Sequence, residues 1–100
     1  MGLKKWGFVY TLGGDGEAER RDELGSEACR LVAVGVSDVA HAARVAVDLA
    51  NDGCELIEFC GAFGATPMAE VIAALEPLEV PVGTVTYGGD ATQGLHRIFG

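Results

Sequence analysis

The chain has 100 residues, 49% of them hydrophobic, and carries a formal net charge of -8 from 15 acidic and 7 basic side chains. This length allows one domain with a single modest core, and we expect that domain to span residues 1–100. The negative charge argues against nucleic acid and anionic membranes as partners, because binding either one requires basic residues that neutralise phosphates.

The composition also bears on assembly and location. So high an apolar content in a short chain predicts that a partner covers part of the apolar surface, and we expect a homo-oligomer. No apolar run approaches the roughly 20 residues of a membrane span, and the opening MGLKKWGFVY lacks the long apolar region of a signal peptide. We therefore expect a cytoplasmic protein.

Two stretches near the start have the pattern of β-strands. Between residues 6 and 12 large side chains alternate with small ones, so that one face carries Trp6, Phe8, Tyr10 and Leu12. Residues Leu31 to Val36 are continuously apolar, which is typical of a parallel strand covered on both faces. The connection between the strands, Gly13 to Ala28, is polar. Within it Glu17 to Leu24 has helix propensity without an apolar face, so the connection is either a functional loop or a mobile one.

The middle of the chain predicts a helix, a strand and a second helix. Ser37 can cap the first helix, whose apolar residues recur at intervals of three and four, and Gly53 ends it. Glu55 to Cys60 is the third strand. Pro67 suits the first turn of the next helix, which Pro77 closes. The stripe that this second helix is expected to bury consists of Met68, Val71, Ile72 and Leu75.

A fourth strand, Val80 to Tyr87, precedes a short last helix. Asp90 and Gln93 resemble a capping box at its start, and the stripe expected to be buried is Leu95, Ile98 and Phe99. Strands that alternate with helices predict a parallel α/β sheet with right-handed crossovers. We predict a small open sheet of four mainly parallel strands with helices on both faces, in Rossmann-like or flavodoxin-like layers.

Ligands of open α/β sheets bind beyond the carboxyl ends of the strands, where the third strand ends in ELIEFCGAFGATP. Glu58 in this stretch enters a sheet that is expected to be covered. A buried carboxylate without a partner favours its protonated form, as in a general acid or base. The alternative is a structural role, in which Glu58 accepts backbone hydrogen bonds or pairs with Arg30 or Arg97.

Cys60 ends the same strand just before a helix, whose dipole favours a thiolate, so Cys60 is a candidate nucleophile. The alternative is that Cys60 packs as a small hydrophobic residue. Backbone N–H groups of the turn after it can bind an anion or a carboxylate, or the glycines simply turn the strand into the helix. The candidate ligand-binding residues are Gly61, Phe63, Gly64 and Thr66, with Tyr10 and Tyr87 at the walls.

The sequence contains no recognised motif for binding a metal ion or a cofactor. The three cysteines and two histidines do not fall at the spacing of metal ligands, and the glycines match neither a Walker A loop nor a dinucleotide fingerprint. We expect no metal and no cofactor.

Several short motifs resemble one family. Val32 to Gly35, the E-F-C-G-A-F-G of residues 58–64, and the VPVG and TYG between Val80 and Gly88 are similar to motifs in a family of short bacterial α/β proteins of unknown function. The resemblance implies a common α/β fold, marks the turn at residues 58–64 as the family's hallmark and implies no activity.

Two functions fit the sequence. The first is a small-molecule binding protein or enzyme that takes a small polar or carboxylate-bearing metabolite at the carboxyl ends of the strands. The alternative is a non-catalytic structural or assembly subunit that acts through homo-oligomerisation. The sequence alone leaves open whether the protein is an enzyme.

Overall fold

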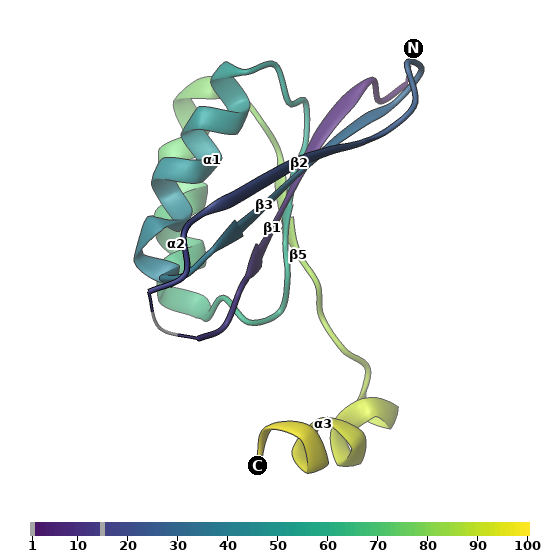
Figure 1. The fold of residues 1–100 in the computed structure, drawn as a ribbon, viewed down its shortest axis with the longest axis vertical. Coiled ribbons are helices and arrows are strands. Elements are labelled where there is room, and N and C mark those ends of the chain that lie inside the picture. The colour runs from purple at the N-terminus through teal and green to yellow at the C-terminus, as the bar shows by residue number, and fades with distance from the viewer. Residues whose placement is uncertain (1, 15) are drawn as a thin grey trace.

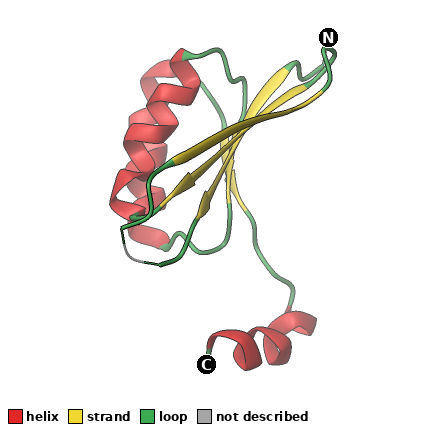
Figure 2. Ribbon diagram, in the orientation of Figure 1, coloured by secondary structure: helices red, strands yellow, loops and turns green. Residues whose placement is uncertain are grey.

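The computed structural model describes residues 2–14 and 16–100, which form one mostly parallel sheet and three α-helices (Figures 1 and 2). The strands are β1 (Lys5–Thr11), β2 (Arg20–Gly25), β3 (Arg30–Val36), β4 (Ile57–Phe59) and β5 (Val82–Thr84). The helices are α1 (Ala42–Asn51), α2 (Ala65–Leu75) and α3 (Thr92–Phe99). The order across the sheet is β2-β3-β1-β4-β5, and only the pairing of β2 with β3 is antiparallel. The α/β class is therefore confirmed, but the sheet has five strands where four were expected.

The additional strand, β2, lies in the polar connection from Gly13 to Ala28, where the sequence indicated only helix propensity. It forms a hairpin with β3, and residues 26–29 make the turn, in which the Ser26 N–H donates to the Cys29 carbonyl at 3.0 Å. Because β2 is an edge strand, its charged side chains are solvated or paired, and the apolar alternation of a buried strand is missing. The Arg44 side chain of α1 pairs with Glu19, just before β2, at 2.6 Å.

Both α1 and α2 lie on the same face of the sheet, contrary to the expectation of helices on both faces (Figure 1). The topology explains why. The connections from β3 to β4 and from β4 to β5 step in the same direction across the sheet, and right-handed crossovers then place both helices on one side. The connection from β1 to β3 steps the other way, and a helix there would cover the opposite face. That connection forms β2 instead, so no helix of the described chain covers this face.

The two faces of the sheet therefore have different environments. Val9, Val32 and Val34 point towards α1 and α2 and are fully or almost fully buried. They pack with Leu49, Ile57, Phe59, Val71 and Leu75 in one core. The opposite face carries the large residues of β1, namely Trp6, Phe8 and Tyr10, all only half-buried. The expectation that Leu31 to Val36 is covered on both faces is wrong, because Leu31 and Ala33 are half-buried on this second face.

We call this second surface the open face. Its residues share a side because directly paired positions on neighbouring strands point the same way. One row across the strands is Leu24, Leu31 and Trp6, and the next is Asp22, Ala33, Phe8, Glu58 and Gly83. Tyr10 and Leu12 lie over Gly35, where a Cβ atom would come within 2.8 Å of the Tyr10 ring. The open face is thus a mainly apolar surface with aromatic residues along β1.

The helices differ from the sequence prediction in three places, two at helix ends and one in the buried stripe of α2. Asp38 caps the 3₁₀ turn before α1 by accepting from the Ala40 N–H at 2.9 Å, a role expected of Ser37. Asp90 belongs to a 3₁₀ turn before α3, and its side chain makes no capping hydrogen bond there. In α2, Met68, Val71 and Leu75 are buried as expected, but Ile72 is 54% exposed.

Helix α3 stands beyond the carboxyl edge of the sheet, apart from α1 and α2 (Figure 1). None of its residues is buried, and its apolar Ile98 and Phe99 are 73% and 81% exposed. The buried stripe predicted for this helix is therefore wrong for the isolated chain. The fold leaves two apolar surfaces uncovered, the open face and the apolar stripe of α3.

At the end of the sheet away from its carboxyl edge, where β1 begins, two carboxylates accept hydrogen bonds. Asp52, after α1, accepts hydrogen bonds from Lys5 at 3.0 Å and from Arg21. These contacts lower the pKa of the Asp52 carboxyl, and the hydrogen bond and charge of Lys5 contribute most. Glu55 accepts from the Lys4 and Lys5 N–H groups at 2.8 and 3.2 Å, which likewise lowers its pKa. Asp52 thus ties the start of β1 to the end of α1, and Glu55 ties it to the loop between α1 and β4.

Candidate functional site

A cavity of about 570 Å³ opens at the carboxyl edge of the sheet, where β1 and β4 end and α3 comes near. Such an edge is where open α/β sheets bind ligands, and the volume is within the usual range for small-molecule sites. The lining residues are Thr11, Cys60, Gly61, Ala62, Tyr87, Leu95 and Phe99.

Backbone hydrogen bonds fix the floor of this cavity. The Cys60 N–H donates to the Val9 carbonyl at 2.9 Å, which continues the pairing of β1 with β4 by one residue beyond β4. The Val85 N–H donates to the Phe59 carbonyl, also at 2.9 Å, and so brings the segment after β5 alongside the turn at Gly61. The ends of three strands therefore meet at the cavity.

Gly61 and Tyr87 lie against each other in the wall. A Cβ atom at Gly61 would lie 3.0 Å from Cε2 of Tyr87 and 3.2 Å from the Val85 carbonyl oxygen. Glycine at position 61 therefore lets the Tyr87 ring lie directly on the backbone of the turn. Tyr87 itself is 58% exposed, so its other side is accessible to a ligand or to solvent.

The polar groups of the lining are few. Thr11 and Tyr87 contribute hydroxyls and Cys60 a thiol, while the other lining side chains are apolar or absent. No lysine or arginine is among the lining residues that the structure describes, and the chain as a whole carries a net charge of -8. This electrostatic environment favours a neutral ligand over an anion.

Three of the residues predicted from sequence meet at the cavity: Cys60, Gly61 and Tyr87. Tyr10 is turned over Gly35 on the open face, away from the cavity lining. Phe63 is 4% exposed and packs edge-on against Phe59 in the core, with ring centroids 5.0 Å apart. Gly64 is the N-cap residue of α2 and Thr66 lies exposed in its first turn, and neither lines the cavity.

Glu58 lies on the open face, between Phe8 of β1 and Gly83 of β5, and does not line the cavity. Its side chain is half-buried. No hydrogen bond or ion pair of the described chain involves this carboxylate, so the pairing with Arg30 or Arg97 weighed from the sequence is not formed. Glu58 and Cys60 are thus not assembled into one catalytic group.

Four lining residues were missed by sequence reasoning. Thr11 stands at the carboxyl end of β1, so its position in the strand was a usable signal. Ala62 belongs to the turn after β4, and its small side chain gave no chemical signal. Leu95 and Phe99 belong to the apolar stripe of the last helix, which the sequence pattern assigned to the core.

The three cysteines differ in burial. Cys54 is 2% exposed, and burial raises the pKa of its thiol. Cys29 and Cys60 are half-buried. Of the three, only Cys60 lines the carboxyl-edge cavity.

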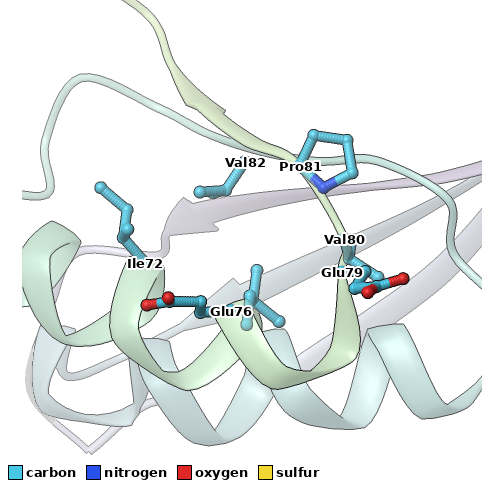
Figure 3. Close-up of a pocket in the computed structure, with 7 residues that line it drawn as sticks. Ile72, Glu76, Glu79, Val80, Pro81 and Val82 are labelled. Atoms are coloured by element: carbon cyan, nitrogen blue, oxygen red, sulfur yellow. The ribbon is translucent and has the colours of Figure 1, made fainter.

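A second hollow, of about 430 Å³, lies between the end of α2 and β5 (Figure 3). Its walls include the apolar side chains of Ile72, Val80 and Val82. Glu76 and Glu79 are its polar residues, and Figure 3 shows the Glu79 carboxylate turned away from Ile72. Because this hollow lies beside an edge strand and not at the carboxyl ends, we regard the larger cavity as the candidate site.

Within residues 2–14 and 16–100, no three His, Cys, Asp or Glu side chains gather into a group that could hold a metal ion. Among the same residues, no helix has the length and apolar character needed to cross a membrane.

The fold and the cavity define a small α/β protein with helices on one side of a five-stranded sheet and a candidate ligand site at the sheet's carboxyl edge. The chain belongs to the Family of unknown function (DUF6506), whose model matches residues 4–100. Searches among curated proteins and among solved structures find no significant match. The match confirms the part of the resemblance that concerns a family of unknown function, and it assigns no activity.

Proposed function

We propose that this protein binds a small, neutral, mainly apolar molecule in the cavity at the carboxyl edge of the sheet. The observation that carries the proposal is the cavity itself, because its volume of about 570 Å³ and its position match the usual binding site of open α/β sheets. The ligand class follows from the described lining residues, among which hydroxyl and thiol groups are the only polar side-chain groups.

This ligand class differs from the polar or carboxylate-bearing metabolite expected from the sequence. That expectation depended on backbone N–H groups in the turn that carries Gly61, Phe63, Gly64 and Thr66, and of these four residues only Gly61 is among the described lining residues. An anion would also enter a chain with a net charge of -8 without a cation in the described lining to receive it. A ligand with an apolar body and one hydrogen-bonding group fits better, with Tyr87 or Thr11 as its polar partner.

Binding is favoured over catalysis by the same lining. A base that would activate Cys60 as a nucleophile is missing from the described lining residues, which include no His, Asp or Glu. Glu58, the other catalytic candidate, lies on the open face instead. We therefore assign Cys60 to the wall of a binding site.

The test is a ligand-observed NMR screen of neutral fragments and of carboxylate fragments against the whole chain. We expect neutral, largely apolar fragments to bind, and Gly61→Ala to weaken them because the added methyl displaces the Tyr87 ring. Gly89→Ala is the matched control, since no atom lies within 4 Å of a Cβ at that position. Selective binding of carboxylates, or equal binding by both variants, would contradict this site.

A further inference from the structure

The open face is unusual for a sheet of this class because mainly parallel sheets are normally covered on both sides. Here Trp6, Phe8 and Leu31 remain half-buried on the uncovered side. Leu24 of β2 is 55% exposed in the same surface. Exposed apolar surface of this extent marks an interaction site, and the question is which occupant covers it.

The total surface area of the chain indicates the size of the missing contact. The chain exposes 6425 Å². A folded monomer of 10.4 kDa is expected to expose about 5400 Å², so about 1000 Å² is in excess. A standard protein interface buries about 800 Å² on each partner. The excess is therefore enough for one interface per chain.

The overall dimensions lead to the same conclusion. The Cα radius of gyration is 14.1 Å, compared with about 13 Å for a compact domain of 100 residues. Helix α3 accounts for the difference in shape, because it projects beyond the sheet without a buried residue (Figure 2). Its largely exposed Ile98 and Phe99 form an apolar stripe with Leu95, which is half-buried and lines the carboxyl-edge cavity together with Phe99. The same chain thus presents an uncovered sheet face and an uncovered amphipathic helix.

We propose that a second copy of this chain covers the open face, so that two copies pack sheet against sheet and the α3 stripe of each packs on its partner. A two-fold contact of this kind uses the same patch on both chains and is the commonest form of self-association. It covers both uncovered surfaces at once and leaves the carboxyl-edge cavity at the margin of the contact. This interface does not depend on the ligand proposed above.

The surface that the contact buries includes charged groups at defined places. Arg20 and Asp22 of β2 already form an ion pair at 2.7 Å, near the edge of the open face. Glu58 is the one carboxylate of the face without a partner in the described chain. The polar side of α3, with Gln93 and Arg97, lies opposite its apolar stripe and remains in solvent when the stripe is buried.

The experiment is sedimentation velocity on the full chain from about 1 to 100 µM, the range in which interfaces of modest size dissociate. We expect a species of twice the 10.4 kDa chain mass. Leu24→Lys and Phe99→Lys should each raise the dissociation constant at least about tenfold, because they place a charge in the apolar contact. Lysine lowers the net negative charge, so general repulsion cannot cause the weakening.

Ile72→Lys is the matched control, because Ile72 is 54% exposed, close to the 55% of Leu24, but lies on α2 away from the open face. This variant should associate like the wild type. A monomer throughout the range would overturn the proposal and would favour α3 folding over its own sheet. Equal weakening by Leu24→Lys and Ile72→Lys would place the interface elsewhere, and loss of association in Leu24→Lys alone would remove α3 from it.

Discussion

The contrast between the two faces of the sheet predicts opposite effects of the same substitution at two strand glycines. Gly7 of β1 faces α1, and a Cβ atom there would lie 2.9 Å from Cδ1 of Leu49. Leu49 is completely buried and cannot move aside without disturbing the core. Gly83 of β5 lies on the open face, and a Cβ atom there would meet no atom within 4 Å.

The magnitudes follow from packing and from the unfolded chain. Gly7→Ala should destabilise the fold by about 1–3 kcal/mol, the usual cost of forcing a methyl group into a packed core. Gly83→Ala should be neutral or should stabilise it by about 0.4–1 kcal/mol, because alanine restricts the unfolded chain more than glycine does. The two variants should therefore differ by about 2 kcal/mol, or roughly 8–16 °C in melting temperature for a domain of this size.

Urea denaturation of both variants and of the wild type, at one protein concentration, measures this difference directly. The slope of the transition should stay the same, so that the shift in midpoint reports stability alone. If Gly7→Ala were as stable as Gly83→Ala, α1 would not be packed against β1 as described. The assignment of one covered and one open sheet face would then be wrong.

Three further predictions concern acid stability, thiol reactivity and the carboxylate of the open face. Because the pKa of the folded-state Asp52 carboxyl is lowered, this group stabilises the fold at pH values above the ordinary aspartate pKa, near 4. That stabilisation is lost as the pH falls through the folded-state pKa, so Asp52→Asn should lose less stability on acidification than the wild type. Urea midpoints measured from pH 6 down to pH 2 test this, and identical pH profiles would contradict it. Because burial raises the pKa of the Cys54 thiol, iodoacetamide should label Cys54 at least about tenfold more slowly than Cys60. Peptide mass spectrometry measures the two labelling rates, and preferential labelling of Cys54 would contradict its burial. Glu58→Gln should lower the dissociation constant of self-association about tenfold, because the wild type must bury an unpaired carboxylate in the contact. Weaker association of the variant in sedimentation would show instead that Glu58 makes a favourable contact across the interface.

The sequence predicted most of the secondary structure because the core strands and helices have strong periodicity. The alternation around Trp6, Phe8 and Tyr10 placed these side chains correctly on one face of β1. It could not tell which face the helices cover, and the buried face proved to be the one with Gly7 and Val9. That choice depends on the direction of the crossovers, which is a property of the whole topology.

The strand β2 was missed for a physical reason. An edge strand needs no apolar alternation when one side is solvated and its charges are paired by residues distant in sequence, as Arg21 is paired by Asp52. Helix α3 was misjudged for a related reason, since amphipathic periodicity predicts that a stripe becomes buried but not which molecule buries it. At the candidate site, Cys60, Gly61 and Tyr87 could be found because they follow strand ends. Leu95 reaches the cavity only through the tertiary path of the chain after β5.

The most direct test of the central claim, that a second copy covers the open face, uses the only tryptophan of the chain. Trp6 lies half-buried on that face, beside Leu31. Acrylamide quenching of its fluorescence should be measured across the concentrations over which sedimentation shows monomers becoming dimers. We predict that the quenching constant falls as the dimer forms, because the partner shields the indole. An indole that is quenched equally in monomer and dimer would contradict the claim and would show that the chains associate through another surface.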